Sequence, residues 1–382
     1  MASNNASAHA EAALSGAHPR ALAAMSGGVD SSVAAYLLTD QGFETEGVTL
    51  KLFENEDACL ASSRVCCSLK DAEEARQVCL TLGIPHFVYN FTRTFNHDVI
   101  DRFCDGYLAG ETPNPCIDCN RYVKFAALQQ RRRELGYDYV ATGHYARRAF
   151  DEKTGRYLLL RGRDANKDQS YVLFHLTQDT LAHMLFPLGE LTKPEVRAIA
   201  ARQGFINANK PESQDICFVP DGDYATFIGK RRGTAFPPGD IVDRAGHVLG
   251  RHRGLIHYTV GQRKGIGVAA REPLYVCAKD AERNLLVVGT DAETRCTGVV
   301  VRDVNLIALA ELSGPVRCEV KTHYRQTARP AVVTPREDGG ATIAFDEPQR
   351  ACAPGQAAVF YQGDVVVGGG TIESVQGLGA GC

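Results

Sequence analysis

A seven-residue loop, SGGVDSS at residues 26–32, constrains the fold of this chain more than any other feature of its sequence. It follows a short apolar stretch at residues 20–25 and leads into a helical pattern over residues 31–39. Its two glycines let backbone N–H groups approach an anion closely, and its last two serines add hydroxyl donors at a helix N-terminus. The loop therefore predicts a phosphate-binding strand–loop–helix unit. A tight turn without a ligand would explain any two of these residues, but it explains the whole heptapeptide poorly.

Strand-like and helix-like patterns alternate along the first part of the chain. Strands are predicted at residues 20–25, 47–53, 86–89 and 139–142, and helices at residues 31–39, 69–82, 95–108 and 122–135. Such alternation predicts an α/β domain with a doubly wound parallel sheet that is covered by helices on both faces. Ligands of such sheets collect at the carboxyl ends of the strands, where both the loop and Gly143 are expected to lie.

The sequence changes character after Gly204, where glycine and proline become frequent and helical patterns fade. From about Thr297 a period of two residues predicts short strands in a small antiparallel barrel. We therefore expect a disordered N-terminal tail, an α/β catalytic domain, a small basic central domain and a C-terminal β-barrel. Their predicted boundaries are residues 1–19, 20–222, 223–295 and 296–378.

The charge balance excludes one class of protein. The chain has 42 Lys and Arg against 45 Asp and Glu, a net charge of −3, so it is not a uniformly basic coat for nucleic acid. Residues 229–271 nevertheless carry nine basic and two acidic residues, a net charge of +7 that leaves −10 for the rest. This basic segment predicts a footprint for a phosphate backbone. The N-terminal tail lacks the basic region of a signal peptide, and no apolar span suits a bilayer, so we expect no membrane contact. The 13 cysteines lack the spacing of a disulfide framework, which predicts a cytoplasmic protein with reduced thiols.

Two cysteines stand in contexts that favour reactivity. Cys119 opens a predicted helix with Arg121 and Lys124 one turn away, so we expect its pKa to be lowered. Cys217 lies in an otherwise polar loop, ESQDICF. The alternative for each is a small buried side chain, which is the usual environment of a free cysteine.

The loop resembles the SGGxDSS loop of the N-type ATP pyrophosphatases, enzymes that adenylate a substrate oxygen and release pyrophosphate. Five further motifs are TPNPxxxCN from Thr112, ATGHY from Ala141, KDQSY from Lys167, SQDICF from Ser213 and GQRKG from Gly261. They stand in the order found in bacterial tRNA-specific 2-thiouridylases, and the match runs over residues 22–372. On these motifs the chain is identified as similar to that family.

The resemblance implies an ATP-dependent tRNA sulfurtransferase that uses Mg²⁺. ATP would adenylate O2 of the wobble uridine, U34, in the tRNAs for Lys, Glu and Gln, and a persulfide would then place sulfur on C2 and release AMP. The sulfur would come from a cysteine desulfurase or a relay protein. By the same resemblance Cys217 carries the persulfide and Cys119 releases its sulfur, which leaves a transient Cys119–Cys217 disulfide.

The resemblance also implies the binding residues. Those for ATP would be Ala24, Met25, Ser26, Gly27, Gly28, Val29, Asp30, Ser31, Ser32, Leu50 and Gly143. The target base would be bordered by Asn114, Pro115 and Cys116, and the tRNA would contact His144, Lys167, Asp168, Gln169, Tyr324, Arg325 and Gln356.

Alternatives stay open at this point. Cys116 stands where some relatives carry Asp, and it forms a CxxC with Cys119. With Cys217 this makes three potential thiolate ligands for a metal or an iron–sulfur cluster, although a single CxxC does not define such a site and we expect no metal. The phosphate loop by itself would equally fit an enzyme that adenylates a small molecule. A non-catalytic RNA-binding module that holds a metal or a cluster is the third possibility.

Overall fold

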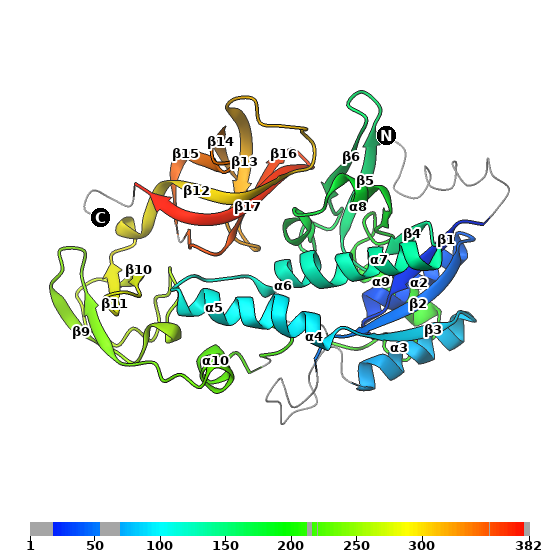
Figure 1. The fold of residues 1–382 in the computed structure, drawn as a ribbon, viewed down its shortest axis with the longest axis horizontal. Helices are drawn as coiled ribbons and strands as arrows, with labels where there is room; N and C mark the ends of the chain where they lie inside the picture. The colour runs from blue at the N-terminus through cyan, green and yellow to red at the C-terminus, as the bar shows by residue number, and fades with distance from the viewer. Residues whose placement is uncertain (1–17, 54–68, 212–215, 220, 351, 378–382) are drawn as a thin grey trace. The chain divides into compact units, whose positions relative to one another are not determined.

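The computed structural model of the chain describes residues 18–53, 69–211, 216–219, 221–350 and 352–377. The chain forms two compact units, each built from segments that are distant in the sequence (Figure 1). Unit 1 comprises Met1–Val99, Cys116–Asp221 and Asp364–Val366, and unit 2 comprises Ile100–Pro115, Gly222–Gly363 and Val367–Cys382. Within the described ranges, no helix has the length and apolar character needed to cross a bilayer.

Unit 1 is organised around a five-stranded parallel sheet with the order β3-β2-β1-β4-β7. Its strands are β1 (Arg20–Ala24), β2 (Glu44–Lys51), β3 (His86–Asn90), β4 (Tyr139–Ala141) and β7 (Met184–Leu185). All neighbours pair in parallel, for example Ala21 with Thr45 of β2 and with Tyr139 of β4. The central strand β1 is an apolar run because both faces of a doubly wound sheet are covered.

Helices cover this sheet on both faces. The main ones are α2 (Val29–Asp40), α3 (Leu69–Leu82), α7 (Ala126–Leu135) and α9 (Lys193–Arg202). Residues of α2, α3 and α9 share one apolar cluster with Ala21 and Ala23 of β1. Leu22 is fully buried but lies outside that cluster, and α7 packs against β1 and β4, because successive side chains of a strand point to opposite faces. The predicted α/β fold is therefore confirmed.

Two helices that the sequence predicts as continuous each contain a π-helical segment. The first predicted helix consists of α4 (Thr92–Phe95), the π-helical η1 (Asn96–Asp101) and α5 (Arg102–Leu108). The second begins earlier than predicted and consists of α6 (Pro115–Asp118), the π-helical η2 (Cys119–Phe125) and α7. A π segment shifts the side-chain phase without changing composition, so periodicity did not reveal it; such segments are frequent at functional sites.

Unit 1 also contains elements that the sequence pattern did not predict. The strands β5 (Ala146–Asp151) and β6 (Arg156–Arg161) form an antiparallel hairpin, and Leu160 of β6 pairs with Val365. The short helices η3 (Ser170–Leu173) and α8 (Gln178–Ala182) follow. The hairpin begins five residues after the last residue of β4, and the segment between them contains Gly143 and His144.

Unit 2 contains a small mixed sheet and a barrel. The small sheet has the order β10-β11-β8-β9 and comprises β8 (Gly239–Val242), β9 (Val248–His252), β10 (Tyr275–Asp280) and β11 (Leu285–Gly289), accompanied by α10 (Tyr224–Arg232) and η4 (Leu255–His257). Its core includes Ile241, Tyr258 and Ile266.

The barrel has six antiparallel strands in the order β12-β15-β14-β13-β16-β17, and it closes because β12 also pairs with β17. They are β12 (Arg295–Leu306), which follows η5 (Ala292–Thr294), β13 (Val316–Lys321), β14 (Arg329–Pro335), β15 (Ala341–Arg350), β16 (Ala357–Gln362) and β17 (Val365–Gln376). The interior is filled by small and β-branched side chains such as Val299, Val320 and Ile343. The predicted C-terminal antiparallel barrel is therefore confirmed.

Candidate active site

The SGGVDSS loop connects the carboxyl end of β1 to the first turn of α2, and its own side chains shape it. Ser31 Oγ accepts a hydrogen bond from the Ser26 N–H at 3.1 Å and donates to the Gly28 carbonyl at 2.9 Å. Ser32 Oγ donates to the same carbonyl at 3.1 Å. Gly28 precedes the helix without a side-chain cap, and among the described residues a Cβ added there would meet Ser26 Oγ alone, at 3.4 Å. The loop is thus an open cradle at a helix N-terminus, which fits a phosphate group.

Contacts with other segments of the chain hold the backbone of Gly27 in place. Its φ is +70°, and a Cβ would overlap the backbone carbonyl of Asp71, so only glycine fits. The Gly27 carbonyl accepts hydrogen bonds from Asn207 Nδ2 at 3.0 Å and from Lys210 Nζ at 3.1 Å. Asn207 also donates to Ser32 Oγ at 2.9 Å. Two residues about 180 positions further along the chain therefore hold the cradle in shape.

A buried lysine faces the acidic residue of the loop. Lys193 is only 8 % exposed, and its Nζ lies 2.6 and 2.8 Å from the two carboxylate oxygens of Asp30. The Tyr145 hydroxyl donates to Asp30 Oδ1 at 2.9 Å. Lys193 is the first residue of α9, whose start is fixed by a capping box between Thr192 and Glu195. This cation beside the phosphate cradle was not identified from the sequence, because only folding brings it to a partner 163 positions away.

The ends of neighbouring strands meet the loop at the same edge of the sheet. A Cβ on Gly143, two residues after β4, would lie 2.8 Å from the carbonyl carbon of Asp30 and from the amide nitrogen of Ser31. Leu50, next to last in β2, is 8 % exposed. The predicted ATP-binding loop and Gly143 are therefore in direct backbone contact at the carboxyl edge, where parallel sheets bind ligands.

His144 joins this edge to the helix that carries Cys119. Its Nδ1 is hydrogen-bonded to Thr142 Oγ1 at 2.9 Å, and its ring lies 5.8 Å from that of Phe125, the last residue of η2. Loss of solvation and the nearby charge of Lys124 hold the pKa of His144 well below its usual value. The imidazole is therefore neutral at physiological pH.

Cys119 is the first residue of the π-helical η2 and is 6 % exposed. Burial raises the pKa of its thiol to about 11, and Lys124 opposes this only partly. The expected lowering of this pKa is therefore wrong. The reason is that α6 leads directly into η2, so Cys119 lies inside a continuous helical segment instead of at a free helix N-terminus. Cys116, one turn earlier, is exposed.

Cys217 is partly exposed and lies in a turn that is anchored by the next residue. Phe218 is 1 % exposed and packs edge-on against Phe95, with ring centroids 5.8 Å apart and an interplanar angle of 79°. Phe95 belongs to α4, and α4 packs against η2, which begins at Cys119. The structure thus attaches both cysteine segments to one set of helices in unit 1, and their pairing stays a prediction.

The part of the chain that the structure describes contains no group of three or more His, Cys, Asp or Glu side chains placed to hold a metal ion. The alternative of a cluster on Cys116, Cys119 and Cys217 therefore receives no support. Mg²⁺ needs less from the protein, because it commonly binds through one or two carboxylates, substrate phosphates and water. The Asp30 side chain, 31 % exposed beside the cradle, fits that requirement.

The KDQ residues of unit 1 are engaged within the protein. The Asp168 carboxylate is 8 % exposed and accepts hydrogen bonds from the Gly162 and Ser170 N–H groups and the Ser170 hydroxyl. Gln169 accepts from the Tyr145 N–H at 3.0 Å and donates its own N–H to the Tyr145 carbonyl at 2.9 Å. Gln169 thus holds the segment that contains His144, and Asp168 holds Gly162 and Ser170. Contact of Lys167, Asp168 and Gln169 with tRNA stays a prediction.

In unit 2 the barrel holds the segment that leads to Asn114 and Pro115. Gln356 Nε2 donates to the Thr112 carbonyl at 2.7 Å, and the Thr112 N–H donates to the Pro354 carbonyl at 2.8 Å. Tyr324 and the exposed Arg325 lie in the turn between β13 and β14. Gln356 is therefore connected to the predicted target-base segment, a long-range link that no sequence spacing indicated.

Three family models match the chain in succession. The tRNA methyl transferase HUP domain matches residues 19–221, the tRNA methyl transferase PRC-barrel domain residues 225–290, and the aminomethyltransferase beta-barrel domain residues 296–372. Together they span most of the 382 residues.

Curated proteins match over nearly the whole chain. The chain is 53 % identical to the tRNA-specific 2-thiouridylase MnmA of Moorella thermoacetica over 354 residues, which cover 93 % of this chain and 99 % of that protein. It is 50 % identical to the protein of the same name from Symbiobacterium thermophilum, with 93 % and 92 % covered. Among solved structures, a 4-thiouridine synthetase–RNA complex with bound ATP is 20 % identical, with a TM-score of 0.37 over 53 % of this chain and 45 % of that one.

Proposed function

Because this chain belongs to the tRNA-specific 2-thiouridylase family, we propose that it adenylates O2 of the wobble uridine of tRNA and replaces that oxygen with sulfur. It is a tRNA sulfurtransferase, and tRNA is its substrate. The observation that carries the mechanism is the direct backbone contact between the phosphate cradle and Gly143, in the segment that follows β4. The next residue, His144, packs against Phe125 of η2, the π-helix that begins at Cys119. Nucleotide and sulfur chemistry thus use adjacent segments of unit 1.

The cradle performs the first half of the reaction. Backbone N–H groups at the start of α2 and the hydroxyls of the loop receive the β- and γ-phosphates of ATP. Lys193, in contact with Asp30, supplies the positive charge that stabilises the departing pyrophosphate. Asp30 and the phosphates would hold Mg²⁺, which would neutralise charge on the triphosphate. The uridine O2 attacks the α-phosphorus, and this adenylation converts a poor leaving oxygen into AMP.

The two cysteines perform the second half. Cys217 carries a persulfide, and the Cys119 thiolate attacks its inner sulfur, so the sulfur–sulfur bond of the persulfide breaks and hydrosulfide leaves. Hydrosulfide adds to C2 of the adenylated uridine and expels AMP. The two thiol sulfurs are thereby oxidised to a Cys119–Cys217 disulfide, which an external dithiol must reduce before the next turnover.

The substrates and the site of action follow from the same family membership. We propose that the tRNAs are those for Lys, Glu and Gln, that a cysteine desulfurase or a relay protein supplies the persulfide, and that the reaction takes place in the cytoplasm. The base leaves the anticodon stack to reach the site, since C2 is otherwise inaccessible. Asn114, Pro115 and Cys116 border it, and the residues named above for tRNA position the stem and loop. The division of the chain at residues 222 and 295 into three domains belongs to the same proposal.

Thiolation of unmodified tRNA in vitro tests the proposal. The reaction contains ATP, Mg²⁺ and a chemically generated persulfide donor, and 2-thiouridine, AMP and pyrophosphate are each quantified. Cys119→Ser and Cys217→Ser should abolish 2-thiouridine. Cys277→Ala is the matched control, because Cys277 is buried to the same extent as Cys119, each 6 % exposed, but lies in the small sheet of unit 2.

The products separate this proposal from its alternatives. Release of AMP and pyrophosphate without tRNA, and without need of Cys217, would indicate a small-molecule acceptor. Full thiolation by both serine variants would refute the cysteine mechanism. RNA binding without any ATP turnover, unchanged in Asp30→Ala, would indicate a non-catalytic module.

A further inference from the structure

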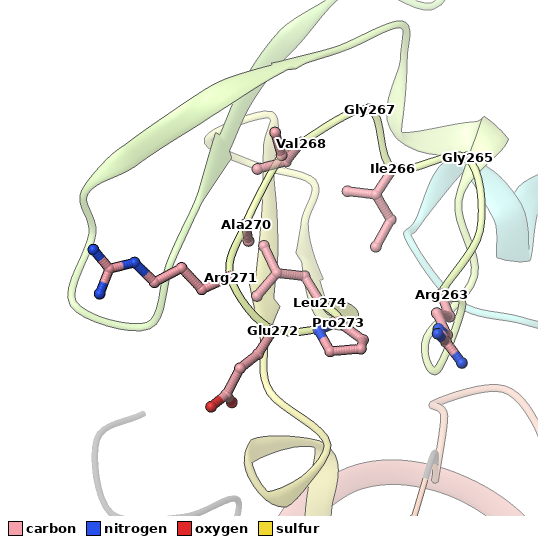
Figure 2. A pocket seen from close by; sticks show the side chains of 11 residues that line it. Arg263, Gly265, Ile266, Gly267, Val268, Ala270, Arg271, Glu272, Pro273 and Leu274 are labelled. Atoms are coloured by element: carbon pink, nitrogen blue, oxygen red, sulfur yellow. The ribbon is translucent and has the colours of Figure 1, made fainter.

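The small sheet of unit 2 carries a cavity formed by a single loop. Eleven residues line it, all between Arg263 and Leu274, and its volume is about 440 Å³ (Figure 2). This volume falls within the range of about 300–1,000 Å³ that is usual for sites of small organic ligands. The cavity lies in the basic segment of the chain and takes no part in the mechanism above.

The cavity has an apolar floor. Ile266 is 5 % exposed and belongs to the core of the small sheet, and Val268 and Leu274 pack against the same core. In Figure 2 the side chains of Ile266 and Leu274 lie on the inside of the loop. The flat face of a nucleobase can stack on these side chains while its polar edge stays toward the exposed rim.

The rim of the cavity carries more basic than acidic side chains, since Arg263 and Arg271 line it together with one exposed carboxylate, Glu272. Arg263 and Arg271 lie on opposite sides of the loop in Figure 2, and Lys264 is adjacent to Arg263. All three are exposed, and none forms an ion pair with another described residue. By contrast Arg231 and Arg232, from the same basic segment, are paired with Asp101 and Asp105. Three basic residues at or beside the cavity are therefore available to bind phosphate, as are the exposed Lys230 and Arg253 elsewhere in the segment.

The loop is held in a defined shape although it has no helix or strand. Gln262 Oε1 accepts a hydrogen bond from the Thr259 N–H at 3.0 Å, and its Nε2 donates to the Lys264 carbonyl at 2.9 Å. The Val276 N–H also donates to the Gln262 carbonyl at 2.9 Å, which ties the loop to β10. Gly265 and Gly267 have φ values of +78° and +83°, so they permit the tight path around the cavity. A preformed site loses less entropy on binding.

We propose that this cavity is a binding subsite for one unpaired nucleotide of the tRNA, distinct from the target uridine. The base rests on Ile266, Val268 and Leu274, and the guanidinium groups of Arg263 and Arg271 bind its two flanking phosphates. An unpaired nucleotide fits best because its base enters the cavity without the cost of breaking a base pair. This inference rests on the proposed function, since it requires a tRNA substrate.

Two variants test the two halves of the subsite separately. Ala270→Trp fills the cavity from an exposed lining position, and Arg263→Ala removes a charge from the rim. The matched control is Arg283→Ala, which removes an arginine that is 79 % exposed from the β10–β11 turn outside the cavity. Affinity for unmodified tRNA is measured by fluorescence anisotropy at several salt concentrations. ATP affinity, measured in parallel, reports on unit 1.

We expect Ala270→Trp to weaken tRNA binding at least about fivefold, the lower end of the effect of losing one stacked base, without changing the salt dependence. Arg263→Ala should weaken binding and also reduce the slope of log K against log salt by about 0.7–0.9, the value for one phosphate contact. Arg283→Ala should stay within about twofold of wild type, and ATP affinity should be unchanged in all three. A benzophenone side chain at position 270 should crosslink to an unpaired nucleotide.

Other outcomes would overturn the subsite. If Ala270→Trp binds tRNA as wild type does, or if position 270 crosslinks only to a base-paired stem, the cavity holds no nucleotide of the tRNA. If uridine monophosphate binds the cavity and tRNA does not displace it, the site serves a free nucleotide. If wild type itself binds ATP but not tRNA, the proposed function fails together with the inference, whereas tight wild-type binding with insensitive variants refutes the subsite alone.

Discussion

Replacing Gly143 by alanine should displace the phosphate cradle from its position. A Cβ at Gly143 would lie 2.8 Å from the Asp30 carbonyl carbon and the Ser31 nitrogen, about 0.6 Å closer than the 3.4 Å at which ordinary contact begins. Both atoms belong to the backbone at the start of α2, so no flexible side chain can move aside. The strand end and the cradle must separate, at a cost of about 1–3 kcal/mol that is typical of overpacking.

This displacement should affect catalysis more than stability. The melting temperature of unit 1 should fall by about 2–12 °C, since a domain of this size loses about 2–4 °C per kcal/mol. A misplacement approaching 1 Å can cost about 100-fold in rate. We therefore expect kcat for pyrophosphate release in the presence of tRNA to fall at least about tenfold. Differential scanning calorimetry and a coupled pyrophosphate assay measure the two effects.

Gly314→Ala is the matched control, because no atom of the described residues lies within 4 Å of a Cβ at Gly314 and its φ is not positive. It should retain wild-type melting and activity. A Gly143→Ala protein with the melting temperature and pyrophosphate release of wild type would show that the cradle does not depend on this contact.

Three further predictions concern residues that only the fold identifies. Lys193→Met should leave the Asp30 carboxylate without its cation, and urea titrations should show a free energy of unfolding lower by about 1–3 kcal/mol. Pyrophosphate release should be at least about tenfold slower. Activity equal to that of wild type would refute the role of Lys193 in phosphate binding. Phe218→Leu should remove the edge-on packing on Phe95, which holds the Cys217 segment in place. Separate assays should show slower formation of 2-thiouridine while pyrophosphate release by adenylation persists. An equal loss of 2-thiouridine and of pyrophosphate would contradict a role of Phe218 in anchoring Cys217 alone. Alkylation of Cys119 by iodoacetamide, followed by mass spectrometry, should be slow at pH 7 and accelerate as the pH rises toward about 11, and a rate at pH 7 equal to that of a free thiol would be inconsistent with the raised pKa. Because this folded-state pKa lies above the roughly 8.5 of an unfolded thiol, the neutral thiol stabilises the protein below about pH 8.5, and that stabilisation is lost as the pH rises through about 11.

The pattern of apolar residues was sufficient to predict the parallel sheet and the barrel. The alternation of strands and helices predicted the parallel sheet, and the period of two residues predicted the barrel. Both features depend on burial of one face or two faces of an element, which the linear sequence records directly. The β5–β6 hairpin was missed because β5, with the sequence ARRAFD, lacks a strongly apolar face, although β6 reads RYLLLR.

The chemistry of Cys119 was predicted less well than its position. Motif spacing singled out the residue, but its pKa depends on burial and on where the helix begins, and neither is local. The π-helical η2 lies between α6 and α7 and places Cys119 in the interior of a continuous helical segment. A helix-dipole argument from the sequence therefore had the wrong sign.

By itself the sequence determined that the chain would place a glycine- and serine-rich anion cradle between a buried strand and a helix, since backbone freedom and hydroxyl donors are properties of the residues alone. Only the tertiary structure decided what surrounds that cradle. Asn207 and Lys210 brace it, Lys193 provides its cation, and Gly143 meets its backbone, across separations of more than 100 residues. The physical reason is that charge pairing and steric contact depend on distance in space, and a parallel sheet brings strand ends together whatever their separation along the chain.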